Sequence, residues 1–283
     1  MMKILFPTDF SNAAENAYIF ALRLAKQLKA PITVLHVYTL PDVSPWLELP
    51  DINREVNDLV TNDEFDSFKT RIDTLKRIAS ENTLDDVDIN YSLRESAYVV
   101  NGIVDEANDM KADLVIMGTN GASGFKKAVY GSVALKTMEE STCPVLLVPD
   151  KAFFKGIIDI GLTLEYLPEE KELVRQSLAF ATKINGHLDC FHVDTGDHNK
   201  MKSDPVEWQQ EFKLDSHISF HMHYSLDTKK GIIEYCKQKH LDMLVMRAHH
   251  RNMIRELFSS SLAIKVAYDI HIPLLTFHLP ESA

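Results

Sequence analysis

The sequence predicts an α/β protein made of two tandem, doubly wound parallel sheets. Short apolar runs of strand length alternate with longer amphipathic segments through the first 150 or so residues, which is typical of a parallel sheet with helices on both faces. A glycine-rich stretch separates one of these runs from the start of a helix. Landmarks of the first half then recur in the second half, so one domain pattern is used twice.

The first half is expected to contain five strands, at residues 3–6, 31–37, 87–93, 114–117 and 145–148. Its helices are expected at 12–28, 51–82 and 97–110, with a last one that begins near Ser132. Ser11 suits the cap of the first helix, in which apolar residues recur at helical spacing. The first two strands are almost entirely apolar, as strands covered on both faces are.

The stretch from Asp113 to Pro149 carries the strongest functional signal. It places four glycines, Gly118, Gly121, Gly124 and Gly131, between an apolar strand and a helix start. Glycine lets backbone N–H groups approach an anion, and a helix N-terminus adds donors without partners. Ser132 is suited to cap that helix or to bind a phosphate with its hydroxyl. The alternative is that the glycines only turn the chain.

The second half repeats the first with two offsets. The run around His36 recurs around His192, a shift of 192 − 36 = 156, and the run around Pro144 recurs around Pro273, a shift of 273 − 144 = 129. Strands are therefore expected at 156–162, 187–193, 218–224, 241–246 and 274–277. The two copies, residues 1–149 and 156–283, would be joined near residues 149–155.

Composition limits the function classes. The chain has 283 residues and a net charge of −11, which disfavours non-specific binding to nucleic acid or to an anionic membrane. No apolar run approaches the length of a spanning helix, and the N-terminus does not resemble a signal peptide. Three scattered cysteines without a CxxC motif indicate neither a disulfide framework nor a metal site, so a reducing cytoplasm is expected.

The glycine spacing, Gly118-x2-Gly121-x9-Gly131-Ser132, resembles the ATP-binding signature of the universal stress protein family. Residues 4–9 and 34–37 resemble the first two strands of that family. The stretch is not a P-loop, because it lacks the lysine of that motif. The resemblance implies the flavodoxin-like, adenine nucleotide alpha hydrolase-like strand order 3-2-1-4-5, with the ligand at the switch point between strands one and four.

The resemblance also implies roles for residues of the first copy. The cofactor would be ATP, accompanied by Mg²⁺, and the ligand-binding positions would be Pro7, Thr8, Asp9, Val37, Met117, Gly118, Gly121, Gly131, Ser132 and Val133. Asp9 has an alternative role as the cap of the following turn. His36 recurs as His192, which favours a structural role. Lys126 and Lys127 either screen phosphate charge or lie in a solvated loop.

The second copy has lost this signature. The repeat offset carries Gly118 to Arg247 and Gly121 to His250, while Gly131 and Ser132 become Ser260 and Ser261. A β-carbon at these positions would obstruct a phosphate, so no ATP is expected there. Residues 247–251 are then a solvated loop, a site for another anionic metabolite, or part of a metal site. His217, His221 and His223 share one parity and are expected on the solvent face of a strand.

The favoured function is a nucleotide-binding regulatory protein of the stress response, read by an unknown protein partner. No catalytic or metal-binding residue is assigned, and slow ATP hydrolysis is the most that the sequence suggests. The resemblance also implies pairing through strand five, so residues 145–148 and 274–277 are expected to pair into an internal pseudo-dimer, and further homodimerisation stays open. The alternative is an interaction or chaperone-like scaffold, with Trp46 and the helix after it as a partner surface.

Overall fold

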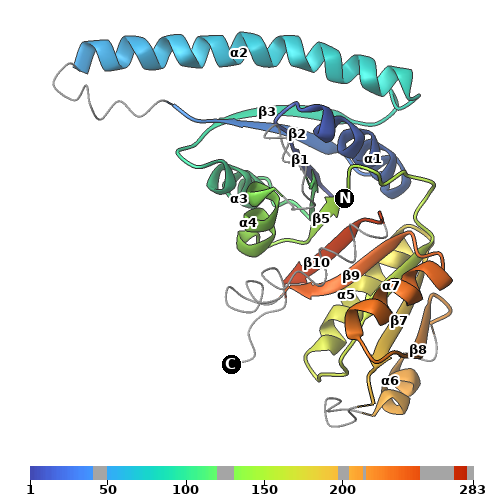
Figure 1. The fold of residues 1–283 in the computed structure, drawn as a ribbon. Helices are drawn as coiled ribbons and strands as arrows, with labels where there is room; N and C mark the ends of the chain where they lie inside the picture. The colour runs from blue at the N-terminus through green and yellow to red at the C-terminus, as the bar shows by residue number, and fades with distance from the viewer. Residues whose placement is uncertain (41–49, 120–130, 197–203, 213–214, 249–270, 279–283) are drawn as a thin grey trace.

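The computed structural model describes residues 1–40, 50–119, 131–196, 204–212, 215–248 and 271–278 (Figure 1). Several residues singled out from the sequence lie outside these ranges: Trp46, Gly121, Gly124, Lys126, Lys127, His249, His250, Ser260 and Ser261. The fold is α/β, as expected, and its strands join into one sheet that runs through both halves of the chain.

The sheet has ten strands in the order β3-β2-β1-β4-β5-β10-β9-β6-β7-β8. In the first half these are β1 (Ile4–Pro7), β2 (Ile32–Tyr38), β3 (Ile89–Glu95), β4 (Leu114–Gly118) and β5 (Val145–Val148). In the second half they are β6 (Asp159–Thr163), β7 (His187–Asp194), β8 (Ile218–Tyr224), β9 (Met243–Ala248) and β10 (Leu274–His278). The order 3-2-1-4-5 is confirmed, and all pairs within each half are parallel.

The helices of the first half lie where the periodicity predicts them. The first half contains α1 (Asn12–Leu28), α2 (Pro50–Glu81), α3 (Val99–Asp109) and α4 (Ser132–Glu140), and the second contains α5 (Glu170–Lys183), α6 (Pro205–Glu211) and α7 (Thr228–Gln238). Ser11 caps α1 as expected, because its side chain accepts the N–H of Ala14. The N-cap of α4 is Gly131, so of the two roles left open for Ser132 the structure does not support the helix cap.

The repeat is visible in the backbone conformation. Phe10 and Tyr166 have φ angles of 57° and 58°, and their numbers differ by 166 − 10 = 156. Lys111 and His240 both have a φ of 53°, and their numbers differ by 240 − 111 = 129. Residues other than glycine seldom adopt this left-handed backbone conformation. Its recurrence at both offsets shows that equivalent turns have the same geometry in the two halves.

Gly102 and Gly231 form a further equivalent pair, since 231 − 102 = 129. A β-carbon on Gly102 would lie 2.6 Å from Cγ1 of Val37, and one on Gly231 would lie 2.5 Å from Cγ1 of Val193. Val37 and Val193 are themselves related by the offset of 156. Each half therefore uses a helical glycine to bring its third helix close to its second strand.

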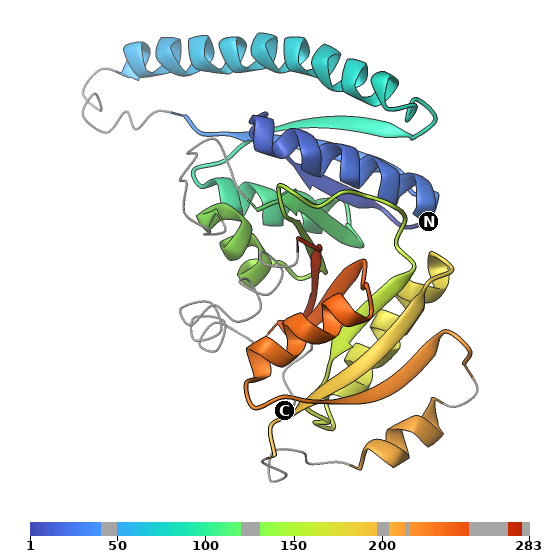
Figure 2. The same ribbon diagram turned by 45° about the vertical axis from the view of Figure 1, so that its right-hand side comes forward.

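The two halves meet through β5 and β10, which pair antiparallel (Figure 2). Leu147 lies opposite Leu274, and Leu146 lies opposite Leu275. The expected internal pseudo-dimer is therefore present within the chain. The pairing covers two strand edges that would otherwise be open to association. None of the helices in the described part of the chain is long and apolar enough to cross a membrane.

Candidate functional site

A cavity of about 270 Å³ opens at the carboxyl ends of β1 and β4. These strands are neighbours in the sheet, but the chain leaves them in opposite directions, to β2 and to β5. Ligands of open α/β sheets bind at such a switch point. The cavity lining contains every described residue of the predicted binding set, namely Pro7, Thr8, Asp9, Val37, Met117, Gly118, Gly131, Ser132 and Val133, while Gly121 lies outside the described residues.

One wall of the cavity is apolar. Leu35, Val99 and Ile103 line it together with Val37 and Met117. The sequence did not single out the first three, because they belong to ordinary apolar runs and nothing in their pattern separates a pocket wall from a core. A flat apolar group fits this wall, since small-molecule sites are mostly apolar with a few placed polar groups.

The backbone of Val37 supplies polar groups next to this wall. The carbonyl oxygen of Leu35 accepts the N–H of Thr8, so Leu35 directs its backbone polar groups to the side of β2 that faces β1. The paired register of the two strands ends at Pro7 and Leu35. Alternate residues of a strand point their N–H and C=O groups to the same side, so Val37 faces that side too, beyond the end of β1. Its N–H and C=O are therefore directed toward the cavity.

The opposite end of the cavity is the start of α4. The first hydrogen bond of this helix runs from the N–H of Leu135 to the carbonyl of Gly131. The N–H groups of Ser132, Val133 and Ala134 precede it and have no partner within the helix. They form a donor set for an anion, strengthened by the helix dipole. The N–H of Gly131 itself donates to the carbonyl of Thr119.

Thr119 is a site residue that the sequence analysis missed. It lines the cavity, is 1% exposed, and its hydroxyl has no hydrogen-bond partner among the described residues. A buried hydroxyl without a partner costs free energy unless a ligand or water satisfies it. Its position directly after Gly118 was the available signal.

Asp9 and His36 stabilise the turn beside the cavity. Oδ1 of Asp9 accepts the N–H of Ser11 at 3.0 Å, so Asp9 caps the turn as its alternative role required, and it also lines the cavity. Nδ1 of His36 lies 2.9 Å from the carbonyl oxygen of Thr8. The equivalent contact joins Nδ1 of His192 to the carbonyl oxygen of Leu164 at 2.7 Å. This recurrence supports the structural role expected for His36.

The equivalent region of the second half contains a buried acid. Ala14 lines the cavity of the first half, and its counterpart is Glu170, since 14 + 156 = 170. The Glu170 side chain accepts the N–H groups of Glu165 and Leu167, each at 3.0 Å. Burial raises the pKa of Glu170 to about 7, against an ordinary value of 4.5, even though these two donors and the nearby Arg247 favour the charged form.

Arg247 occupies the position of Gly118 in this second region. It belongs to β9, so its expected place in a solvated loop is wrong. Its guanidinium donates to Glu169 at 3.1 Å, and its side chain is only 19% exposed. A paired arginine and a buried acid thus lie where the first half has a glycine and an alanine.

The histidines near β8 contact other groups of the protein. Nδ1 of His217 lies 2.8 Å from the carbonyl oxygen of Gly186, and Nε2 of His221 lies 3.3 Å from Oδ1 of Asp189. His223 packs edge-on against Tyr235, with ring centroids 5.5 Å apart. The expected solvent-facing arrangement is therefore wrong for His223. Within the described residues no group of three or more acidic, cysteine or histidine side chains is arranged to hold a metal ion.

Comparisons with known proteins give a consistent result. The family model described as "Universal stress protein family" matches residues 1–149 and again 160–278. Universal stress protein MJ0531 of Methanocaldococcus jannaschii is 32% identical over 148 residues, covering 52% of this chain and 81% of the relative. Universal stress protein Slr1230 of Synechocystis is 24% identical over 298 residues, covering 98% of this chain and 100% of the relative.

The crystal structure of a universal stress protein from Archaeoglobus fulgidus superposes with a TM-score of 0.71 at 18% identity. The superposition covers 98% of this chain and 98% of that chain, so the resemblance of fold extends over both halves. The family model matches most of the chain, in two successive segments. The chain therefore belongs to the universal stress protein family.

Proposed function

We propose that the first half, residues 1–149, binds ATP and that the protein acts as a nucleotide-binding regulator of the stress response. The observation that carries this proposal is the cavity at the switch point, which combines an apolar wall, an open strand backbone and the N–H groups of a helix start. The apolar wall and the open strand backbone suit an adenine ring, and the N–H groups of the helix start suit a phosphate chain.

In this proposal the adenine lies against Val37 and Met117 and exchanges hydrogen bonds with the backbone of Val37. The ribose lies near Asp9 and Gly118. The phosphates accept the N–H groups of Ser132 and Val133, and the Thr119 hydroxyl gains the partner that it lacks among the described residues. Gly121 and the hydroxyl of Ser132 complete the cradle, and Mg²⁺ bound to the phosphates offsets their charge.

We propose that the second half, residues 156–283, does not bind ATP in this way. The carboxylate of Glu170 would repel phosphates when it is charged, and Arg247 occupies space that the first half leaves open at Gly118. Arg247 is already paired with Glu169, so its charge is partly offset. Another anionic ligand would have to displace this pair.

Regulation is a better proposal than catalysis. Asp9 is the acid of the cavity lining, and its Oδ1 already accepts the N–H of Ser11. ATP hydrolysis requires a positioned water and stabilisation of the developing charge, often by an arginine. The described lining contains no arginine. Slow hydrolysis is the most that this arrangement supports.

One feature favours the scaffold alternative. The helix α2 is 32 residues long and lies along the outer side of the first half (Figure 1). Leu59 and Phe65 on this helix are 64% and 49% exposed. Exposed apolar side chains on a projecting helix suit contact with a protein partner. Binding of ATP and binding of such a partner are compatible, because α2 contributes no residue to the cavity lining.

The test is to isolate the protein gently and to measure the adenine nucleotide released on denaturation, in parallel with Gly131→Val. Gly131 has a φ of −56°, which valine tolerates, so the substitution acts through the space that its side chain occupies in the cavity. The proposal expects nucleotide with the wild type and none with the variant. Absence from both would favour the scaffold alternative, and equal amounts in both would contradict the proposed site at Gly131.

A further inference from the structure

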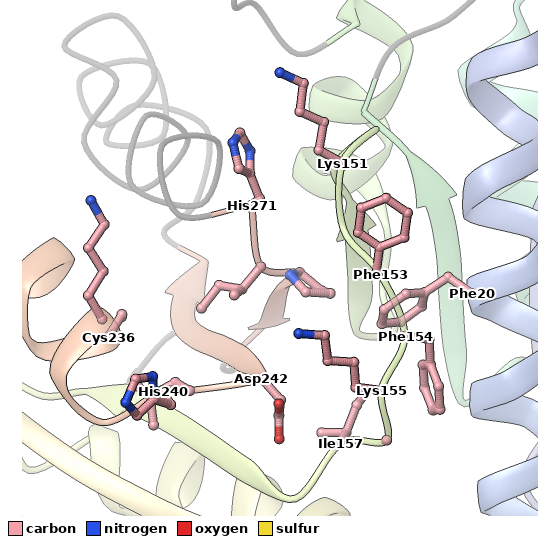
Figure 3. Close-up of a pocket in the computed structure, with 15 residues that line it drawn as sticks. Phe20, Lys151, Phe153, Phe154, Lys155, Ile157, Cys236, His240, Asp242 and His271 are labelled. Carbon is pink, nitrogen blue, oxygen red and sulfur yellow. The ribbon is translucent and has the colours of Figure 1, made fainter.

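A second cavity, of about 370 Å³, lies at the junction of the two halves (Figure 3). The segment between β5 and β6 forms one wall, and the end of α7 with the residues before β10 forms the other. This volume lies in the range of small-molecule sites. The cavity shares no lining residue with the proposed ATP site.

The lining of this junction cavity is cationic although the protein is acidic. It contains three lysines, Lys151, Lys155 and Lys237, and one acid, Asp242. Oδ2 of Asp242 accepts the N–H groups of Ile158 and Asp159, so that carboxylate is already engaged. None of the three lysines forms an ion pair with another described residue, whereas the chain as a whole has a net charge of −11.

The lining also contains aromatic rings. Phe20, Phe153 and Phe154 gather on the side of the connecting segment, and Lys155 extends from that segment toward the wall with His240 and Asp242 (Figure 3). Phe20 is buried, and its ring packs edge-on against Phe154 at 5.0 Å. Phe153 is 78% exposed, so its ring is available to a ligand. Aromatic rings beside unpaired cations suit a ligand with an apolar part and an anionic part.

The repeat provides an internal control for this charge. A cavity of about 320 Å³ lies at the equivalent place of the other half, where Asp113 and Pro144 correspond to Asp242 and Pro273. In that cavity Thr142 occupies the position equivalent to His271. Among the described residues its lining contains one lysine, Lys183, against three in the junction cavity. The cationic character therefore does not follow from the fold, because the same fold builds an equivalent cavity with a different charge.

We propose that the junction cavity binds a small organic phosphate, with Lys155 and Lys237 contacting the phosphate and Phe153 contacting the organic part. Lysine ammonium groups bind phosphate as point charges, and desolvation within a cavity strengthens the contact. The connecting segment joins the two halves, and α7 belongs to the second half. A ligand between them would therefore tie α7 to the connecting segment, beside the start of β10.

The test uses phenyl phosphate and inorganic phosphate as probes, followed through the amide NMR signals of residues 151–157. The Gly131→Val background keeps the probes from the ATP cavity, so the result does not depend on the outcome of the ATP experiments. We expect saturable shifts, and tighter binding of phenyl phosphate than of inorganic phosphate. Phe153→Ala should remove that difference.

The decisive comparison is between two double variants with the same change of charge. Lys155→Gln with Lys237→Gln should weaken phenyl phosphate binding by about tenfold or more. Lys183→Gln with Lys229→Gln, which removes lysines outside the junction cavity, should change it less than about twofold. Lys155, Lys183 and Lys237 are exposed and Lys229 is half-buried, so both proteins should fold. An absence of saturable binding, or equal weakening in the two variants, would overturn the proposal.

Discussion

Ala14 and Glu170 occupy equivalent positions in the two halves, as do Gly118 and Arg247, yet the two backbones follow the same course. The left-handed turns, the close contacts at Gly102 and Gly231, and the histidine-to-carbonyl contacts are shared. The difference lies at the carboxyl ends of the strands. The contacts that the two halves share can therefore persist while residues at the carboxyl ends of the strands change.

The largest effect on stability is expected at Glu170, which has no acidic counterpart in the first half. Its pKa in the folded protein, about 7, lies above the ordinary value of 4.5. Its stabilising contribution is therefore complete below pH 4.5 and is lost as the pH rises through about 7. Glu170→Gln removes this dependence. The free energy of unfolding of the variant minus that of the wild type should therefore be higher at pH 8 than at pH 4.5, by up to about 3 kcal/mol.

Urea unfolding of the wild type and Glu170→Gln at pH 4.5, 6 and 8 measures this effect. Glu172→Gln is the matched control, because Glu172 lies on the same helix with a side chain that is 49% exposed. The control should follow the pH dependence of the wild type. A pH dependence that persists in Glu170→Gln would show that another group is responsible.

The next effect concerns the shared packing glycines. In Gly102→Ala the new β-carbon would lie 2.6 Å from Val37 Cγ1 and 2.9 Å from Ser96 Cβ, and in Gly231→Ala the distances to Val193 and Ser225 would be 2.5 and 2.8 Å. Both variants should lose about 1–3 kcal/mol of stability in urea unfolding. Val37 lines the ATP cavity, so Gly102→Ala alone should also weaken ATP binding. Equal weakening by Gly231→Ala would contradict the proposed difference between the halves.

The smallest effect is expected at the paired histidines. His36→Ala and His192→Ala each remove one contact to a carbonyl oxygen, of Thr8 and Leu164 respectively. Each should cost about 1 kcal/mol in thermal unfolding. A much larger loss of ATP binding than of stability in His36→Ala would indicate that this histidine has a ligand role in addition to its structural one.

The sequence predicts most of this fold because the spacing of apolar residues indicates which faces of the helices and strands are buried. The bounds of α1, β5 and β8 are as expected, and the other predicted elements differ by a few residues at their ends. The pairing of β5 with β10 was implied by the resemblance to the universal stress protein family, and the structure confirms it. The proposed site was predicted where a motif marked it, at Gly118 and Gly131.

Other features depend on tertiary structure and were not predictable. Val99 and Ile103 line the cavity, but in the sequence they resemble any buried helix residues. Glu170 looks like an exposed acid in the first turn of a helix, and only the fold shows that its carboxylate is buried beneath the turn after β6. Arg247 was assigned to a loop because strand ends cannot be located to the residue from apolar runs.

The central claim is that one half binds ATP and the other does not, and calorimetric titration with ATP and Mg²⁺ tests it most directly. The account predicts saturable binding of about one ATP per chain, lost in Gly131→Val and retained in Arg247→Ala, which alters only the second half. Two ATP per chain, or loss of binding in Arg247→Ala with Gly131→Val unaffected, would contradict it.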